Sequence, residues 1–330
     1  MHNSRRKKAV IYFVILIIFS SLLFEGSPIY AEDQGTLTYV KQEDNEFALY
    51  GKLPDGKIIG TAFAKKNWGT WNIDGWFVSE DRRIPSAKMN FVAGTSTDWE
   101  YVYRVSDTEG SCYRFSGGNH GLERMKDLSV INLDNNKPID INKKQKLNIR
   151  NCLQVVEKTI LYSDGECSKP YAEVTRIYYV KPGKIQLETY TTFTRDIYMG
   201  TSYVCMFPVS KKYGGLAHFV DTGHTFETPE YGTTNTNDGF ENFIGKEATL
   251  SVIISSKKEN RFKFRVSIGN AEMVDNFNDE LKTFYWDLNK FSNKLYFSKY
   301  DNDKYLLVAK NTSWYQKNRW ELITDANPPR

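Results

Sequence analysis

The stretch AEVTRIYYVKPGKIQLETYTTF, residues 172–193, carries the strongest indication of the fold. Apolar and polar residues alternate on both sides of the central KPGK, which places proline and glycine where a turn needs them. Alternation puts one set of side chains on each face of a strand. Two alternating runs around a short turn therefore predict a β-hairpin.

The same alternation recurs along most of the chain. In RFKFRVSI, residues 261–268, the apolar side chains share one face, and Arg261, Lys263 and Arg265 share the other. Helical periodicity is weak by comparison, and aromatic residues make up 15% of the chain. Short alternating strands separated by Asn, Asp, Gly and Lys clusters predict an all-β protein, built as a β-sandwich or jelly roll.

The N-terminal segment follows a different pattern. The basic NSRRKK precedes an apolar run of 16 residues, AVIYFVILIIFSSLLF, and EGSPIYA then ends on the small residue Ala31. This order predicts a secretory signal peptide over residues 1–31, because the apolar run is short for a membrane span. We expect the mature chain to be secreted and extracellular; an uncleaved N-terminal anchor is the alternative.

The remaining residues, 32–330, fit one large β-sandwich domain, since no repeat, linker or composition shift divides them. The whole chain has 44 basic and 40 acidic residues, and the predicted leader takes four of the basic and one of the acidic residues. The mature chain is therefore nearly neutral, so nothing global attracts nucleic acid. We expect no nucleic-acid partner, no membrane contact after cleavage, and a monomer.

Four cysteines, Cys112, Cys152, Cys167 and Cys205, are an even number in a chain expected to be exported, which permits two disulfides. The sequence LQVVEKTILYSDGE between Cys152 and Cys167 contains two strand-like runs, so a bridge between these two cysteines would close a hairpin. Three pairings are possible, and free buried thiols are the alternative. The C-x-x-C spacing typical of metal sites is absent.

The segment FSGGNHGLE, residues 115–123, holds three glycines around Asn119 and His120. Glycine is unfavourable inside strands, so such a cluster indicates a sharp turn or a close approach to a ligand. The pKa of histidine lies near working pH, which suits a general base or a charge neutraliser. The alternative is a solvated histidine in an ordinary turn.

A Tyr/Trp-rich exported sandwich with this loop resembles the secreted β-jelly-roll polysaccharide lyases of the alginate- and ulvan-lyase type. In YFSKYDNDKY, Tyr296, Phe297, Lys299 and Tyr305 are similar to the Tyr-Phe-Lys-x-Gly-x-Tyr strand of that group, although the glycine is missing and the spacing differs. Its Arg-Thr-Glu-x-Arg and Gln-Ile-His strands are absent. The resemblance implies cleavage of a uronic-acid-containing, anionic polysaccharide by metal-independent β-elimination, with no cofactor required.

The resemblance also implies catalytic roles for residues of this chain. The uronate carboxylate must be neutralised, a proton removed from C5, and a proton given to the leaving oxygen. Asn119 and Arg195 are the expected neutralisers, His120 the base or a further neutraliser, and Tyr203 the proton donor. Tyr190 and Tyr198 are competitors for the donor role.

Substrate binding is expected from aromatic and basic side chains, because sugar rings stack on aromatic faces and uronates pair with cations. His218 alternates with Ala217 and Phe219, which places it on the face away from the core. His224 lies in a Gly-, Thr- and Asn-rich stretch, residues 219–240, that forms either a lid or a surface loop. The residues expected to bind substrate are Arg104, His218, His224, Tyr190, Tyr198, Tyr296 and Lys299.

Two other functions fit the same architecture. A glycoside hydrolase needs two carboxyl groups, and Asp98 and Glu100 in TDWEY would share one strand face. A non-catalytic carbohydrate-binding or adhesion module would use the same aromatic residues. Either could hold a structural calcium ion through DNFNDE, residues 275–280, or DNDK, residues 301–304, although neither matches a full calcium loop.

Overall fold

The structure, a computed structural model, describes residues 37–41, 43–79, 84, 90–94, 98–110, 113–235, 243–259, 261–274 and 283–324. The predicted leader, Cys112 and the DNFNDE segment lie outside the described residues. Gly35–Arg330 forms one compact unit. None of the helices in the described part of the chain is long and apolar enough to cross a membrane.

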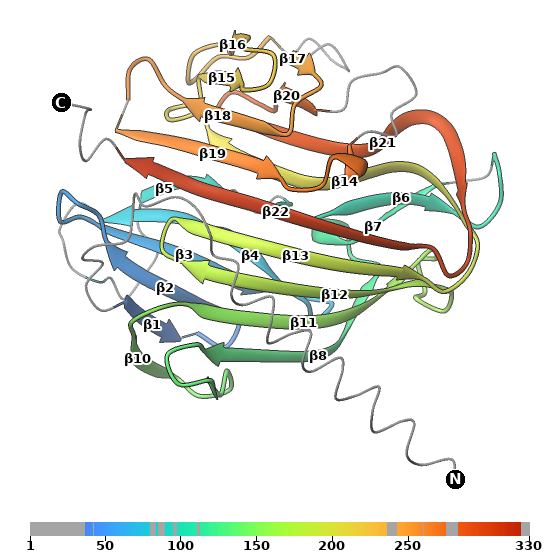
Figure 1. Cartoon of the computed structure of the whole chain (residues 1–330), viewed down its shortest axis with the longest axis horizontal. Coiled ribbons are helices and arrows are strands. Elements are labelled where there is room, and N and C mark those ends of the chain that lie inside the picture. The colour runs from blue at the N-terminus through green and yellow to red at the C-terminus, as the bar shows by residue number, and fades with distance from the viewer. Residues whose placement is uncertain are drawn as a thin grey trace. The chain divides into compact units, whose positions relative to one another are not determined.

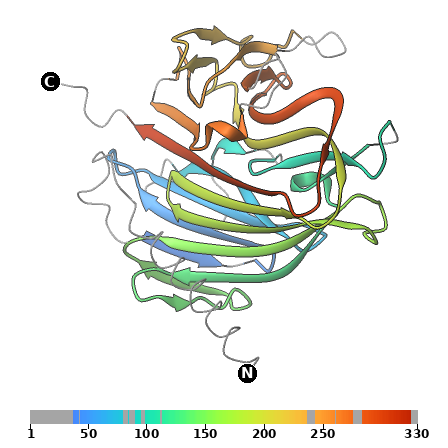
Figure 2. The same ribbon diagram turned by 45° about the vertical axis from the view of Figure 1, so that its right-hand side comes forward.

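Two antiparallel sheets pack face to face and form a β-sandwich, which confirms the predicted all-β class and single domain. In Figures 1 and 2 the green-to-yellow strands β11 to β13 belong to the front sheet, and the blue strands β1 to β4 belong to the sheet behind it. We call the rear sheet A and the front sheet B. The face of each sheet that points away from the other is its outer face.

Within the described residues, sheet A has twelve strands. In spatial order they are β10 (Gln145–Ile149), β1 (Leu37–Lys41), β2 (Glu46–Lys52), β3 (Ile58–Lys65), β4 (Trp71–Ser79), β5 (Asn90–Gly94), β14 (Ile197–Ser210), β21 (Ser292–Val308), β20 (Thr283–Asp287) and β17 (Phe243–Glu247), with β6 (Val102–Ser106) on β14 and β7 (Arg114–Ser116) on β6.

Sheet B has ten strands in the same described ranges. In spatial order they are β16 (Thr225–Glu227), β15 (Leu216–Phe219), β18 (Ser251–Ser255), β19 (Phe262–Ile268), β22 (Ser313–Thr324), β13 (Lys184–Phe193), β12 (Pro170–Lys181), β11 (Leu153–Tyr162), β8 (Glu123–Asn132) and β9 (Lys137–Pro138). Two short 3-10 helices, η2 (Gly118–His120) and η3 (Ala271–Met273), lie between strands.

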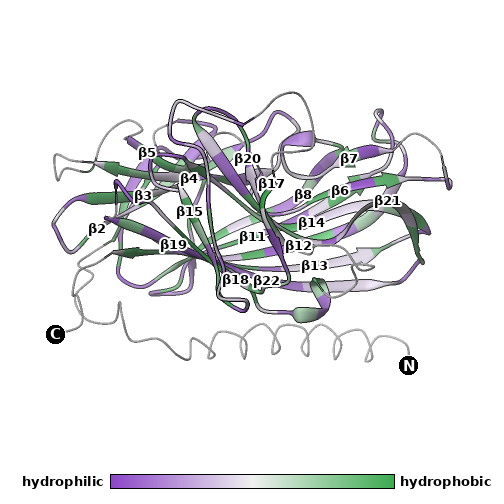
Figure 3. Cartoon of the chain, turned by 90° about the horizontal axis from the view of Figure 1, so that it is seen from above, coloured by the Kyte–Doolittle hydropathy of each residue, from purple (hydrophilic) through white to green (hydrophobic). Residues whose placement is uncertain are grey.

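The predicted hairpin is present as β12 and β13. Lys181 pairs with Lys184 across the turn, where Gly183 adopts a φ of +70° that glycine tolerates best. Alternation also holds in β19, in which Phe262 and Phe264 are at most 3% exposed. Figure 3 shows hydrophobic and hydrophilic segments within the same strands, as expected for strands with one buried face.

An aromatic group fills the centre of the sandwich. Trp99 makes edge contacts with Trp76, Phe207 and Trp320, at ring-centroid distances of 5.5, 5.0 and 5.9 Å. All four side chains are fully buried. Each such pair adds about 0.5–1.5 kcal/mol to the stability that burial itself provides. This core fixes the backbone next to Trp99, and that backbone leads into the candidate site.

The predicted disulfides are wrong for the cysteines that the structure describes. Cys152, Cys167 and Cys205 are free. The sequence between Cys152 and Cys167 forms the single strand β11, paired with β8 and β12, instead of a hairpin. Ten strand residues span roughly 30 Å at the usual rise per residue, whereas a disulfide needs Cα atoms within about 7 Å.

Candidate active site on the outer face of sheet A

The glycine-rich loop closes onto an aspartate far away in the sequence. Gly117, Gly118 and Gly121 all have positive φ, at +84°, +53° and +69°, which other residues rarely adopt. A Cβ at Gly118 would overlap the carboxylate of Asp98. The backbone N–H of Asn119 donates a hydrogen bond to the same carboxylate. The glycines therefore allow the loop to pack directly against Asp98.

Asp98, His120 and Lys294 form what we call the charged cluster. The Lys294 Nζ lies 3.2 Å from the Asp98 Oδ2, and the His120 Nε2 lies 4.0 Å from the same oxygen. Lys294 and Asp98 are buried, with side chains 5% and 9% exposed, whereas 43% of the His120 side chain is exposed. The cluster thus presents an imidazole to solvent above a buried ion pair.

Burial controls the protonation of this cluster. It lowers the pKa of His120 below its usual 6.5, an effect that Asp98 opposes and Lys294 reinforces. Burial also lowers the pKa of Lys294, and the Asp98 carboxylate opposes that change. A lowered pKa keeps the imidazole neutral at neutral pH, which is the form that accepts a proton.

Four aromatic side chains lie beside the charged cluster on the same outer face; we call them the aromatic cluster. The Tyr296 ring lies 4.9 Å from the Lys294 Nζ, and it contacts Phe284 at 4.6 Å and Tyr203 at 4.8 Å between ring centroids. Trp286 completes the group, 6.4 Å from Tyr296. Tyr203, Trp286 and Tyr296 are partly exposed and can stack against the apolar face of a sugar, whereas Phe284 is buried beneath them.

Strands β6 and β7 supply the other edge of the site, next to β14 and β21 in Figure 1. The Phe115 ring stacks on His120 at 4.8 Å and is 36% exposed. Arg104 pairs with Phe115 across the two strands, and its guanidinium lies 5.6 Å from the Tyr305 ring centroid. Because successive side chains of a strand alternate between its faces, Arg104 faces away from the buried Tyr103.

Hydrogen bonds of the next two residues, Trp99 and Glu100, fix the backbone that carries Asp98. The carbonyl oxygen of Trp99 accepts a hydrogen bond from the Met206 N–H at 2.8 Å. Glu100 is buried and accepts a hydrogen bond from the Tyr178 hydroxyl at 3.1 Å, inside the sandwich. Asp98 and Glu100 therefore do not form the acid pair predicted for a hydrolase, because this segment bends instead of continuing as a strand.

A second set of charged groups lies wholly inside the sandwich; we call Glu123, Glu157 and Arg176 the interior cluster. The Arg176 guanidinium pairs with Glu157 and lies 4.0 Å from Glu123, and all three side chains are 0% exposed. Glu157 accepts the Trp71 N–H at 2.9 Å, and Glu123 accepts the Tyr101 hydroxyl at 2.5 Å. Burial raises the pKa of Glu157 to about 7, although Arg176 opposes this.

Two of the predicted basic residues form contacts with groups other than the charged cluster. The Arg195 guanidinium pairs with Asp107 and also donates to the Ser163 hydroxyl. The Lys299 Nζ donates to the Glu272 carbonyl oxygen at 2.6 Å, and its side chain is largely buried. Both contacts support the surrounding loops.

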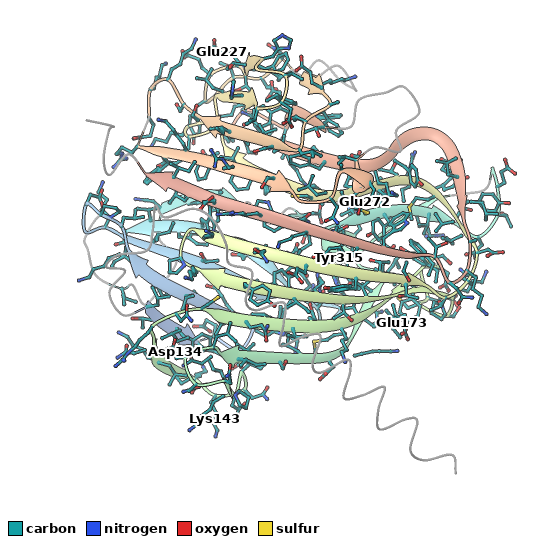
Figure 4. The ribbon with its side chains drawn as sticks, viewed as in Figure 1. Asp134, Lys143, Glu173, Glu227, Glu272 and Tyr315 are labelled. Atoms are coloured by element: carbon teal, nitrogen blue, oxygen red, sulfur yellow. The ribbon has the colours of Figure 1, made fainter. Side chains whose placement is uncertain are left out.

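The competing tyrosines also lie elsewhere. Tyr190 belongs to the outer face of sheet B, where its ring lies 4.9 Å from Tyr315 and its hydroxyl donates to Glu188 at 3.2 Å. Tyr315 lies on the sheet turned toward the viewer in Figure 4. Tyr198 is on β14 and pairs with Ser106 of β6. Of the three tyrosines, Tyr203 belongs to the aromatic cluster, through its ring contact with Tyr296.

Two of the remaining histidines lie in the β15–β16 region. The His218 Nδ1 is 2.9 Å from the Thr225 hydroxyl, and His218 alternates with buried neighbours as predicted. The His224 Nδ1 is 2.5 Å from the Glu247 Oε1, and its side chain is 67% exposed. No group of three or more His, Cys, Asp or Glu side chains in the described part of the chain is placed to hold a metal ion.

The structure thus brings Asn119, His120, Tyr203 and Tyr296 of the predicted residues to one face. It adds Lys294, which sequence reasoning missed. A signal for it existed, because Lys294 and Tyr296 alternate in NKLYF and share a face. No local pattern, however, connects Lys294 to an aspartate 196 residues earlier.

No family model matches the chain, and no curated protein does. Among solved structures, the Slr1438 protein from Synechocystis is similar at 9% identity and a TM-score of 0.39, over 91% of this chain and 100% of that one. Galactose 1-epimerase from Lactobacillus acidophilus is similar at 9% identity and a TM-score of 0.35, over 88% of this chain and 99% of that one. The GH36 α-galactosidase AgaB from Geobacillus stearothermophilus is similar at 9% identity and a TM-score of 0.45, over 87% of this chain and 41% of that one. Similarities this low do not assign chemistry to this chain.

The resemblance to polysaccharide lyases is nevertheless wrong, since the similar structures include sugar epimerases and α-galactosidases instead. The residues behind that resemblance do not act together either. Along β21, Tyr296 is on the outer face, whereas Phe297 is in the core and Lys299 lies over the core residue Trp314. Cleavage by β-elimination is therefore wrong, whereas the comparison does not contradict the two alternatives, a glycoside hydrolase or a non-catalytic carbohydrate-binding module.

Proposed function

We propose that this protein is a carbohydrate-active enzyme that binds a sugar on the outer face of sheet A and interconverts its anomers through His120. One observation carries the proposal: a half-exposed imidazole lies 4.0 Å from a buried carboxylate, which is itself paired with a buried ammonium. A histidine that is merely solvated in an ordinary turn would not need a buried carboxylate and ammonium next to it.

Interconversion of anomers requires the anomeric hydroxyl to lose its proton while the bond from C1 to the ring oxygen breaks. The His120 Nε2 takes that proton as a general base, and water protonates the ring oxygen, because 43% of the His120 side chain is open to solvent. After rotation about the C1–C2 bond, the O5 hydroxyl attacks the other face of C1 and gives its proton to the hydroxide left by the water. The imidazolium gives its proton to the former aldehyde oxygen, which completes the other anomer. General-base catalysis contributes about 100- to 10,000-fold.

The two buried charges suit this cycle. Asp98 raises the pKa of His120 and so stabilises the imidazolium that forms after proton transfer. Lys294 lowers the same pKa, which favours return of the proton. The imidazole thus responds to two opposing charges, while burial lowers its pKa and favours the neutral form that accepts a proton.

The aromatic rings around the cluster supply the binding surface. Phe115 stacks on His120, and Tyr296 lies over Lys294. A sugar ring placed against these faces would expose its hydroxyl groups to the imidazole. Hydrolysis of a glycosidic bond is less well supported, because it uses two carboxyl groups about 5–10 Å apart, and Glu100 points into the sandwich.

The test is exchange between anomers of free monosaccharides, measured by NMR saturation transfer on glucose, galactose, mannose and glucuronate. We expect the purified protein to raise the exchange rate of at least one of these sugars in proportion to protein concentration. If a sugar binds in the same titration but its exchange rate does not rise, the protein is a binding module and the enzymatic proposal is wrong. If no sugar binds, the whole proposal is wrong.

A further inference from the structure

A groove of about 400 Å³ lies at the end of the paired strands β14 and β21. Its lining includes Ser210 and Ser292, which pair across these strands, together with Tyr231 and Phe291. None of these residues belongs to the charged cluster or the aromatic cluster. The groove is therefore a separate feature of the molecule.

Two of the residues that line the groove are exposed aromatic rings. Tyr231 is 54% exposed and Phe291 is 57% exposed, and their ring centroids are 5.4 Å apart. Large apolar side chains exposed singly are common, but two adjacent rings that face a groove indicate a binding surface. The pair presents flat apolar faces of the kind on which a sugar ring stacks.

A buried ion pair fastens the backbone that follows Tyr231. The Lys211 Nζ lies 2.5 Å from the Asp287 Oδ1, with both side chains 0% exposed, and it also donates to the Thr233 carbonyl oxygen at 2.6 Å. The Asn235 N–H donates to Asp287 at 2.9 Å. These contacts fasten the segment that carries Tyr231, so its ring does not need to be ordered when a ligand binds.

The same segment is tied to the turn that carries the second ring. The Gly232 N–H donates to the Lys290 carbonyl oxygen at 2.8 Å, next to Phe291. Tyr231 and Phe291 therefore lie on neighbouring, hydrogen-bonded backbones. This backbone hydrogen bond holds the two residues next to each other.

The groove also carries positive charge. Lys212 is exposed at its edge, with its Nζ 5.9 Å from the Tyr213 ring centroid. Arg261 lies in the lining as well, but Glu259 accepts hydrogen bonds from it at 2.6 and 2.8 Å and balances its charge. A ligand that combines a sugar ring with a carboxylate would match the two rings and the Lys212 ammonium.

The groove is aligned with the charged cluster. Ser292 and Lys294 are alternate residues of β21, so they share the outer face of sheet A and lie about 7 Å apart along the strand. Their partners on β14, Ser210 and Pro208, have the same relation. The groove and the strand residue that carries the Lys294 ammonium are therefore neighbours on one face.

We infer that the groove is a second sugar subsite, which takes an acidic unit of an oligosaccharide while a neighbouring unit reaches the charged cluster. The inference rests on the sugar-binding face of the proposed function. It adds a binding site, a ligand class and a direction along β21, and it does not depend on the chemistry at His120.

The test uses calorimetric titration with tetragalacturonate and with cellotetraose, which have acidic and neutral units respectively. We expect the wild-type protein to bind tetragalacturonate more tightly. The double variant Tyr231→Ser, Phe291→Ser should lose at least tenfold in affinity, and Lys212→Gln should remove most of the preference for the acidic ligand. Tyr190→Ser is the matched control, because Tyr190 is a similarly exposed ring on sheet B. The affinity of this variant for tetragalacturonate should equal that of the wild type.

Three results would overturn the inference: no binding of either oligosaccharide, equal affinity of the double variant, or self-association of the wild type that the double variant abolishes. The last result, measured by sedimentation, would make the groove an interface between copies of the chain. The exchange assay keeps the two proposals apart. Binding without anomer exchange retains the groove and rejects the enzyme, whereas exchange without oligosaccharide binding does the reverse.

Discussion

The charged cluster and the interior cluster use similar groups in opposite settings. In both, a carboxylate is paired with one cation and held by backbone N–H groups. The interior cluster is 0% exposed throughout, whereas His120 opens the charged cluster to solvent. Burial lowers the pKa of His120 but raises that of Glu157, because it disfavours the charged form of each group.

The difference in exposure indicates that the interior cluster serves stability and that the charged cluster serves function. A sealed ion pair cannot exchange protons with a ligand, and its removal leaves an uncompensated charge in the core. An open imidazole above a buried pair can exchange protons, and its removal leaves the pair beneath it intact. We therefore expect mutations in the interior cluster to affect mainly stability, and mutations of His120 to affect mainly activity.

The largest effect on stability is expected from Arg176→Met. The change leaves Glu157 buried without its cation, which costs about 3–5 kcal/mol in the free energy of unfolding. Urea unfolding followed by tryptophan fluorescence measures this. Lys294→Met is the comparison, and it should cost less, because Asp98 lies nearer the surface and keeps the Asn119 N–H bond. A larger loss in Lys294→Met than in Arg176→Met would contradict the proposed division.

A smaller effect is expected on the titration of His120. Asp98 raises its pKa and Lys294 lowers it, so Asp98→Asn should shift the pKa down and Lys294→Met should shift it up. These directions follow because an opposite charge stabilises the imidazolium and a like charge destabilises it. NMR titration measures them, with the His120 signal assigned by its loss in His120→Gln. Shifts of the same sign in both variants would contradict this electrostatic picture.

The two clusters also predict opposite responses to pH. The lowered pKa of His120 keeps its neutral form down to below pH 6.5, so the exchange rate should fall only below that pH. The pKa of Glu157 is raised from 4.5 to about 7, so its contribution to stability is fully present below the lower value and is lost as pH rises through the higher one.

Unfolding experiments at about pH 5 and about pH 8 check the second half of this prediction. The wild type should lose more stability between the two pH values than Glu157→Gln, which has no carboxyl group to titrate at that position. An equal loss in both proteins would show that Glu157 does not titrate in this range.

The smallest effect is expected on the outer face of sheet B. Tyr190 is 43% exposed and contacts Tyr315 and Glu188, away from both His120 and the groove. Tyr190→Ser should change the exchange rate less than about twofold, because surface changes of this kind usually stay within about 0.5 kcal/mol. A large loss of activity would mean that the functional face has been assigned to the wrong sheet.

The fold was largely predictable because strand signals are local. Alternation in residues 172–193 and 261–268 places the strands and their buried faces correctly. The loop around His120 was also visible, because positive φ at three positions demands glycine. The hairpin between Cys152 and Cys167 was mispredicted, because two short apolar runs and one long strand look alike in sequence.

The site was only partly predictable because its contacts are long-range. Asp98 is 21 residues before Asn119 and 196 before Lys294, and no periodic pattern joins such distant positions. The sequence pairs Asp98 with Glu100 instead, since a two-residue spacing indicates a shared strand face. The bend at this point turns the two side chains to opposite sides, which only the packing around Trp99 decides.

The most direct measurement of the central claim is anomer exchange by wild type and His120→Gln under identical conditions. If the imidazole moves the sugar proton, the variant should lose about 100-fold or more in exchange rate while its unfolding free energy and sugar affinity stay near those of the wild type. An exchange rate in His120→Gln equal to that of the wild type would contradict the account.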